Sequence, residues 1–148
     1  MLLNNSAPLR VACDGESSSG KSTAAKLISK KYKLFCMNSG LLFRYASSLI
    51  IKHKPKEKNL FLRKKFKNLN YKNLTSLNLH SEKISEHVAN LARQKKVRLI
   101  IRNFQKKIIK KHPRICCEGR DQASVILKKN PSYDVAFYFR CNLNTASL

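Results

Sequence analysis

The chain has 148 residues, of which 43% are hydrophobic, and this length predicts one domain with a buried core. No apolar run approaches the roughly 18 residues of a membrane span, and the N-terminus lacks the basic and apolar blocks of a signal peptide, so we expect a cytoplasmic protein without a membrane partner. A total of 31 Lys and Arg against 8 Asp and Glu gives a formal net charge of +23, which favours anionic partners.

The first elements in chain order are a strand, a loop and a helix. Residues 9–13, LRVAC, form a short apolar run that ends at a glycine-containing turn, and they predict a buried strand. Residues 21–31 are rich in good helix formers, and Ala24, Leu27 and Ile28 fall on one side of the expected helix.

The next segment repeats this order. Residues 33–37 predict a short strand, and the following residues 38–40, NSG, predict a turn. Residues 41–52 then predict a helix with one apolar side. Residues 52–81 are polar and rich in lysine, with Pro55 as a helix breaker, and we expect a connector followed by an irregular inserted segment.

The C-terminal half returns to regular patterns. Residues 81–111 carry apolar side chains at alternating three- and four-residue steps, which predicts either one long amphipathic helix or a broken pair, with Ser81 as the N-cap. A second buried strand is expected in RICCEG after Pro113, then a helix in QASVILKK, and a third strand of central type at residues 134–139. Strands separated by helices predict an α/β fold with a parallel sheet covered by helices.

The five cysteines and four histidines do not form a metal-binding pattern. The cysteines contain no C-x-x-C pair and mostly lie among apolar residues, where a reduced thiol packs as a small hydrophobic side chain. The histidines are scattered among lysines. We therefore expect free thiols, solvated histidines and no zinc site.

Residues Gly15–Ser22, GESSSGKS, match the pattern G-x-x-x-x-G-K-[ST] between an apolar strand and a helix, which is typical of a phosphate-binding loop. Such a loop turns backbone N–H groups toward phosphate oxygens, and the helix N-terminus adds partial positive charge. Lys21 can reach the β- and γ-phosphates of ATP, and Ser22 can offer its hydroxyl to Mg²⁺. The alternative is a serine-rich helix-capping turn. The predicted phosphate-binding residues are Gly15, Glu16, Ser17, Ser18, Ser19, Gly20, Lys21, Ser22 and Thr23.

Other candidate residues follow the later strands. Gly40 and Gly119 each come just after an expected strand, and ligands of open α/β sheets bind at the carboxyl ends of strands. Arg44, Arg98 and Arg120 can bind phosphate with a planar guanidinium, although Arg98 can equally be a solvated helix charge. For Glu118 two roles stay open, assistance to Mg²⁺ through water or a cap or salt bridge.

The motifs CDGESSSGKST, NSGLLFR, KVRLII and CCEGRD occur in the order in which the bacterial cytidylate kinases carry theirs, and the chain resembles this family over nearly its whole length. The resemblance implies a three-layer P-loop kinase fold and transfer of the γ-phosphoryl of ATP to CMP or dCMP, with Mg²⁺. It further implies that Ser39 contacts the ribose of the monophosphate, Arg44 and Arg120 its phosphate, and Arg98 and Asp121 the cytosine edge. The implied catalytic residues are Lys21, Arg120 and Asp14.

The chain also departs from the family pattern. Asn38, Phe43 and Ala89 stand where the family usually has Asp, Tyr and Ser, and Gln122 and Ala123 replace the usual Ile-Gly after G-R-D. The final residues, NLNTASL, resemble the start of the helix that leads into the family's lid. We therefore expect a single kinase core over residues 1–148 that lacks the lid and last strand, is a monomer and turns over poorly. Residues 60–98 are its expected monophosphate-binding insertion.

Two other functions remain as alternatives. The charge of +23 would suit a basic nucleic-acid-binding module, but the sequence has no aromatic-rich RNP run, GXXG clamp or zinc-finger spacing. The second alternative is a P-loop kinase for another small substrate, such as a different monophosphate or shikimate. We expect small nucleotides, not nucleic acid, as the partners.

Overall fold

The computed structural model describes residues 6–142, which form two compact units. The sheet unit consists of residues up to Ser39 together with those from Lys107 onward, and the helical unit is Gly40–Lys106. None of the helices within residues 6–142 has the length and apolar character to cross a bilayer. Most of NLNTASL, where we expect the approach to the lid, lies outside the described residues.

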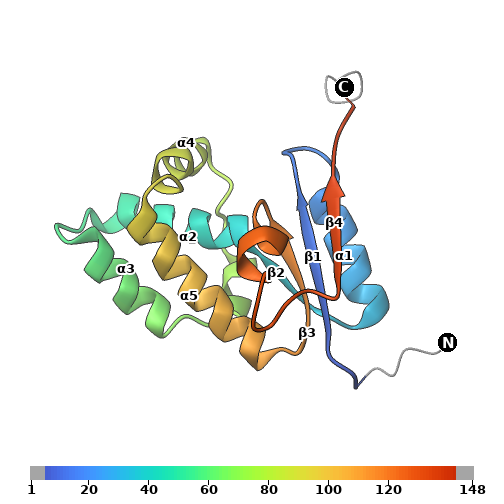
Figure 1. The fold of residues 1–148 in the computed structure, drawn as a ribbon. Coiled ribbons are helices and arrows are strands. Elements are labelled where there is room, and N and C mark those ends of the chain that lie inside the picture. Colours follow the sequence, from blue (N-terminus) through green and yellow to red (C-terminus); the bar gives the residue numbers. More distant parts are fainter. Residues whose placement is uncertain (1–5, 143–148) are drawn as a thin grey trace. The chain divides into compact units, whose positions relative to one another are not determined.

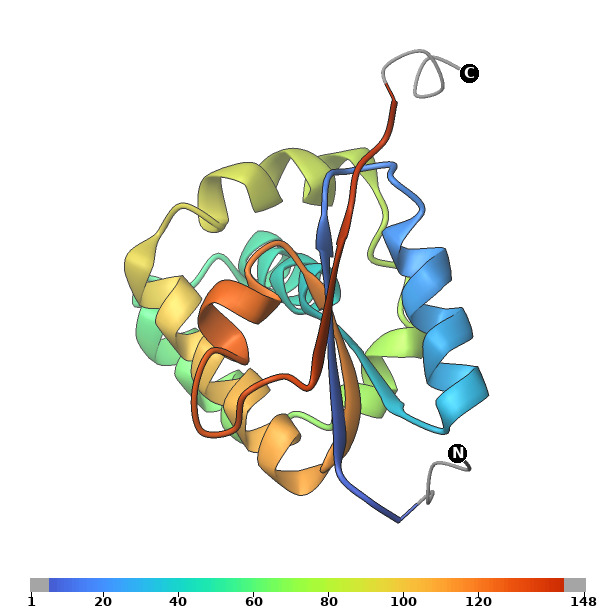
Figure 2. The same ribbon diagram turned by 45° about the vertical axis from the view of Figure 1, so that its right-hand side comes forward.

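In the described part of the sheet unit, four parallel strands lie in the order β2-β3-β1-β4 (Figure 1). Helix α1 contacts β1, β2 and β3, while the helical turn η2 contacts β1 and β3 from the other side of the sheet (Figures 1 and 2). This arrangement confirms the predicted α/β fold with a helix-flanked parallel sheet, as in P-loop kinases. The elements of this unit are β1 (Leu9–Gly15), α1 (Lys21–Tyr32), β2 (Phe35–Asn38), β3 (Arg114–Gly119), η2 (Gln122–Ile126) and β4 (Val135–Phe139).

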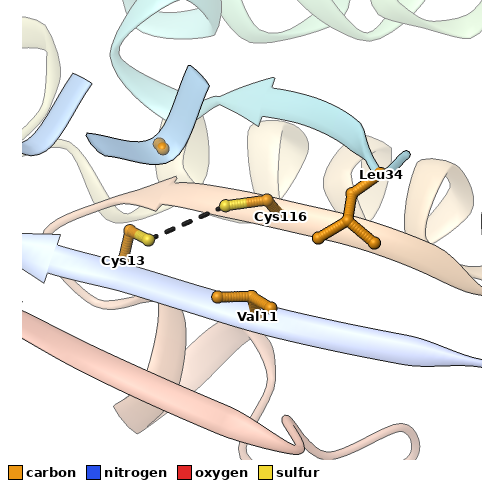
Figure 3. Close-up of a cluster of buried hydrophobic side chains, with 5 residues drawn as sticks. Val11, Cys13, Leu34 and Cys116 are labelled. Carbon is orange, nitrogen blue, oxygen red and sulfur yellow. Dashed lines mark hydrogen bonds between the residues drawn. The ribbon is translucent and has the colours of Figure 1, made fainter. Parts of the chain in front are cut away.

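The core of the sheet unit forms where α1 covers the sheet. Val11, Cys13 and Cys116 of β1 and β3 form a buried cluster with Leu34, in which the sulfur atoms of Cys13 and Cys116 point toward each other (Figure 3), and Ala25 of α1 completes it. Burying an aliphatic side chain such as that of Val11 or Leu34 contributes about 1.5–3 kcal/mol to folding. This packing places α1 against β1 and β3, which are paired along their length in the sheet.

The cysteines are free thiols, and three of the five are buried. The sulfur atoms of Cys13 and Cys116 lie 3.7 Å apart within the core (Figure 3). The contact with Cys13 and the burial of the side chain raise the pKa of the Cys116 thiol, and burial raises that of Cys117. Both therefore stay protonated at neutral pH and pack as small hydrophobic side chains.

The helical unit is held together by aromatic and aliphatic packing among its helices. The ring of Phe66 meets the ring of Tyr45 edge-on at a centroid distance of 5.8 Å, and that of Phe104 at 5.4 Å. These contacts join α3 to both α2 and α5, which lie beside it (Figure 1). The elements are α2 (Ser39–His53), α3 (Lys58–Lys67), η1 (Tyr71–Ser76), α4 (Glu82–Leu91) and α5 (Lys95–Lys111).

The prediction of an irregular segment at residues 52–81 is wrong, since α3 and the 3-10 helix η1 occupy much of it. Leu62 and Phe66 are buried on one side of α3, and Tyr71 and Leu74 are buried in η1. The many intervening lysines hide this spacing in the sequence, because they are exposed and say nothing about the buried side. Tertiary packing against few apolar residues is enough to order the segment.

Residues 81–111 form a broken pair of helices and not one long helix, which was the second of the two predicted arrangements. Helices α4 and α5 are separate, and the turn between them carries backbone bonds from Arg93 to Asn90 and from Gln94 to Leu91. Ser81 caps α4 as predicted, because its hydroxyl oxygen accepts a hydrogen bond from the backbone N–H of Ile84 at 3.3 Å.

Three further predictions need correction. On α1 the buried residues are Ala25 and Ser29, whereas Leu27 is 64% exposed; the Ser29 hydroxyl is satisfied within the helix by the carbonyl of Ala25. The helix expected at QASVILKK is only the single turn η2. Strand β4 is not central, since among the described residues it pairs only with β1 and its side chains are largely exposed.

Candidate functional site

The loop between β1 and α1 folds back on itself. The Nζ atom of Lys21 donates a hydrogen bond to the backbone oxygen of Gly15 at 2.9 Å, and the hydroxyl of Ser19 donates to the backbone oxygen of Glu16 at 2.8 Å. The ammonium group therefore lies across the loop and not along the outer face of α1. This is the placement in which it can meet a phosphate held by the same loop.

Two backbone features of this loop require glycine. Gly20 immediately precedes α1 with φ of 79°, a left-handed conformation that side chains disfavour. At Gly15, a Cβ atom would lie 2.4 Å from the backbone oxygen of Phe139, so only glycine lets β4 approach here. The first turn of α1 contains no acidic residue, which leaves its partial positive charge available to an anion.

Ser22 and Glu118 meet beside this loop. The Ser22 hydroxyl, on the first turn of α1, donates a hydrogen bond to Oε1 of Glu118. Glu118 is 3% exposed, and it sits next to the last residue of β3, opposite Cys13 of β1 and Asn38 of β2. A hydroxyl and a carboxylate are oxygen ligands of the kind that Mg²⁺ uses together with substrate phosphates and water. This pair fits such an ion, although no cluster of three or more His, Cys, Asp or Glu exists within residues 6–142.

The residues after β3 reach back to the loop. The guanidinium of Arg120 donates a hydrogen bond from Nη2 to the Ser17 hydroxyl at 2.9 Å. Gly119 is buried, and a Cβ there would lie 2.2 Å from Oγ of Ser39 and 2.5 Å from Nε2 of Gln122. The sheet register explains this convergence, because Asp14 pairs with Gly119 and the carboxyl ends of β1 and β3 are level.

Asp14 makes contacts that position the segment after β3. Its two carboxylate oxygens accept hydrogen bonds from the backbone N–H groups of Gln122 at 2.8 Å and Ala123 at 2.9 Å. These bonds satisfy the first amides of η2 and fix the chain directly after Arg120 and Asp121. The predicted catalytic role of Asp14 stays a prediction, and its contacts are those of a positioning residue.

The remaining predicted residues belong to the helical unit. Nη1 of Arg44 donates to the backbone oxygen of Leu79 at 3.1 Å and to the Ser85 hydroxyl at 2.9 Å, which ties α2 to the segment that enters α4. Arg98 lies on the exposed side of α5. Their membership of the same site as Lys21 stays a prediction from the resemblance.

Gln122 belongs to this region although the sequence patterns did not indicate it. Gln122 is fully buried, and its side chain fills the space beside Gly119 while its Nε2 atom lies 3.5 Å from Oδ1 of Asp121. A polar residue directly after G-R-D was visible in the sequence only as a departure from the family pattern. Its burial depends on the single turn η2, where the sequence predicted a longer helix.

Comparison with known families decides which kind of phosphate-binding fold this is. The family model for cytidylate kinase matches residues 11–140, which include the phosphate loop, the Ser39 and Arg44 region, and the Glu118–Asp121 segment. The chain belongs to the cytidylate kinase family. The recognised resemblance is thereby confirmed, and the helix-capping-turn alternative for the loop is disfavoured.

Individual members of the cytidylate kinase family are similar to this chain at moderate identity. The cytidylate kinase of Bartonella tribocorum is 29% identical over 141 residues, covering 93% of this chain and 63% of that protein. That of Fusobacterium nucleatum is 32% identical over 127 residues, covering 78% of this chain and 58% of that protein. A bifunctional pantoate ligase/cytidylate kinase of Prochlorococcus marinus is 33% identical over 132 residues, covering 78% of this chain and 26% of that protein. The chain thus spans less than two thirds of the length of the cytidylate kinases that it matches.

Proposed function

We propose that the chain transfers the γ-phosphoryl group of ATP to the phosphate of CMP or dCMP, which gives CDP or dCDP and ADP. One observation supports this most directly: the ammonium of Lys21 lies across a glycine-bounded loop within the segment that matches the cytidylate kinase family. We also propose that the protein works as a monomer in the cytoplasm, and that residues 60–98 serve as its monophosphate-binding insertion.

The phosphates of ATP bind to the loop from Gly15 to Thr23. Backbone N–H groups of this loop and of the first turn of α1 donate to phosphate oxygens, and the helix dipole favours their negative charge. Lys21 exchanges the Gly15 carbonyl for an oxygen of the β- or γ-phosphate. The cost of this exchange is small, because one hydrogen bond of the ammonium is replaced by a charge-assisted one.

A magnesium ion would be held by the Ser22 hydroxyl, with Glu118 accepting a hydrogen bond from its water or from Ser22. When bound, the ion neutralises charge on the β- and γ-phosphates. The burial of Glu118 at the end of β3 holds its carboxylate in place for this role.

The acceptor nucleotide is held by residues that follow β2 and β3 and by Arg98 of α5. Arg120, already joined to the loop through Ser17, can pair with phosphate oxygens at the point of transfer. We assign the acceptor phosphate to Arg44 as well, the ribose to Ser39, and the cytosine edge to Arg98 and Asp121. Asp14 positions Arg120 and Asp121 through the backbone of η2.

The chemical step needs no covalent enzyme intermediate, because an oxygen of the acceptor phosphate is already a nucleophile. That oxygen attacks the γ-phosphorus while the bond to the bridging β,γ-oxygen breaks and its electrons remain with ADP. Lys21 and Arg120 lower the barrier by stabilising the negative charge of the transferring group and by holding donor and acceptor in line.

The proposal is tested by replacing Lys21 with Ala. The variant Lys21→Ala should lose about 100-fold or more of the turnover of CMP with ATP and Mg²⁺, measured as ADP release, because charge stabilisation in the transition state is lost. Lys26→Ala, which removes an exposed lysine from the same helix, is the matched control and should leave turnover unchanged.

A panel of acceptors separates the proposed reaction from that of a related kinase. CMP and dCMP should react faster than UMP, AMP and shikimate. Preference for another acceptor would overturn the substrate assignment, and equal turnover in Lys21→Ala and the parent chain would overturn the phosphate-loop mechanism.

A further inference from the structure

A groove in the helical unit brings aromatic rings and lysines together outside the residues assigned to phosphoryl transfer. Tyr45 of α2, Phe61 of α3 and Leu74 of η1 supply its apolar and aromatic lining. The groove has a volume of about 680 Å³, within the range of sites that hold a group of nucleotide size. Its full lining is Tyr45, Phe61, Lys64, Lys65, Asn68, Leu69, Asn70, Asn73, Leu74, Ser76 and Leu77.

All charged side chains that line this groove are positive. Lys64 and Lys65 are exposed, and none of the lining residues is acidic. The Nζ atom of Lys65 lies over the partly exposed ring of Phe61, 5.6 Å from its centre, and the ring of His53 lies 5.4 Å away, so a base that binds at Phe61 displaces one of these two contacts. Amide side chains at Asn68 and Asn73 add hydrogen-bonding groups of the kind that bind the edges of bases, whereas the side-chain oxygen of Asn70 caps η1 by accepting from the N–H of Lys72.

Positive charge extends well beyond the groove. Between residues 52 and 72 the sequence has nine Lys and Arg residues against a single acidic one, Glu57. All nine are exposed: Lys52, Lys54, Lys56, Lys58, Arg63, Lys64, Lys65, Lys67 and Lys72. A ten-residue helix such as α3 is about 15 Å long, so the positive charges along this segment are spread over more than the length of one nucleotide. A chain of phosphates matches it better than a single phosphate group does.

We infer that this groove and the basic surface of residues 52–72 bind single-stranded RNA, with one base against Phe61 and phosphates on Lys64 and Lys65. Non-specific single-strand binding elsewhere combines these same two elements, aromatic platforms and a basic track. The sequence did not predict nucleic acid because it has no contiguous aromatic run. The fold supplies the combination by placing Tyr45 beside residues 61–77. The proposal adds a site to the kinase and does not depend on the proposed function.

The test measures the binding of a fluorescein-labelled eight-nucleotide oligo(U) to the full chain by fluorescence anisotropy, without ATP, over a range of KCl concentrations. Lys64→Gln/Lys65→Gln should weaken binding and lower the slope of log K against log salt by about 1.4, the value for two phosphate contacts on a single strand. Lys95→Gln/Lys96→Gln is the matched control, since it removes the same charge from exposed positions of α5 in the same unit. An equal loss in both double variants would overturn the proposal.

Stacking is tested separately from charge. Phe61→Leu keeps an apolar side chain of similar size and should weaken RNA binding about fivefold or more, while Phe61→Tyr keeps the ring and should bind as the parent does. Unchanged thermal unfolding of both variants shows that the fold is intact. The stacking site is wrong if the folded Phe61→Leu variant binds RNA like the parent chain. It is also wrong if Phe61→Tyr loses RNA binding, because that variant keeps the ring.

Competition experiments distinguish RNA from other anionic ligands of the groove. Poly-glutamate and vesicles containing anionic lipid should compete only weakly, because they cannot stack on a ring. Strong competition by either would overturn the assignment to RNA in favour of an acidic peptide or a membrane surface. Loss of RNA binding in Lys21→Ala, with Lys64→Gln/Lys65→Gln unaffected, would place the RNA on the phosphate loop and also overturn the proposal.

Discussion

Single atoms decide the geometry at the end of β3. Gly119 has an ordinary backbone conformation, yet its missing side chain leaves the space that Oγ of Ser39 and Nε2 of Gln122 occupy. Two polar side chains can therefore pack against the backbone just before Arg120. The glycine of the G-R-D motif is required here by close packing and not by a left-handed turn.

Replacing Gly119 with Ala should destabilise the fold by about 1–3 kcal/mol, because the added methyl group overpacks this site. The free energy of unfolding, measured by urea denaturation, checks this. In the double variant Ser39→Ala/Gly119→Ala the atom that lies 2.2 Å away is removed, and part of the loss should be recovered. A Gly119→Ala protein as stable as the parent would show that Ser39 and Gln122 do not fill this space.

At the scale of elements, local chemistry sets the start of α4 and the end of α1. Ser81 caps α4 through the N–H of Ile84, and Glu82 follows in the first turn, where a negative charge favours the helix dipole. On α1 the ending is different, since Lys33 adopts a left-handed conformation and its N–H bonds to the Ser29 carbonyl. Both helix caps involve residues within four positions of each other, so they can be predicted from the local sequence.

Ser81→Ala should lower the free energy of unfolding by about 1 kcal/mol, because one N–H at the start of α4 loses its partner. Ser81→Asp keeps an oxygen acceptor and should remain close to the parent in the same urea titration. The interpretation of Ser81 as a cap fails if the Ala variant matches the parent, or if Asp is as destabilising as Ala.

At the scale of the whole molecule, charge acts on folding as well as on binding. The helical unit has 17 Lys and Arg against 3 Asp and Glu, and the sheet unit has 14 against 5, so each unit repels itself. Such repulsion favours the expanded, unfolded chain. Salt reduces it, because the screening length falls from about 30 Å at 0.01 M to about 8 Å at 0.15 M.

Raising KCl from 0.01 to 0.15 M should stabilise the protein by about 1 kcal/mol, or about 4 °C in Tm, as measured by thermal unfolding. Lys95→Gln/Lys96→Gln carries two fewer positive charges and should respond less to salt. A Tm that falls with salt, or a larger response in this variant, would show that attractive ion pairs outweigh the repulsion.

The phosphate loop, the strand before it and the helix after it follow from the sequence alone, because a glycine-bounded loop between two periodic segments is a local pattern. The same holds for the parallel sheet, since alternation of strands and helices restricts the topology. The composition of residues 52–81 gave a wrong prediction of irregular structure. The many lysines obscure the spacing of the few apolar side chains, Leu62 and Phe66 among them, whose burial stabilises α3.

What only the tertiary structure decided depends on residues far apart in the chain. The bonds from Asp14 to η2, the pairing of Ser22 with Glu118, and the grouping of Tyr45 with Phe61 and its lysines each join segments that lie far apart in the sequence. Their partners are chosen by strand register and helix packing, which result from the burial of many side chains together. Sequence patterns could therefore identify the predicted phosphate loop, whereas the surroundings of that loop and the basic aromatic groove exist only in the folded chain.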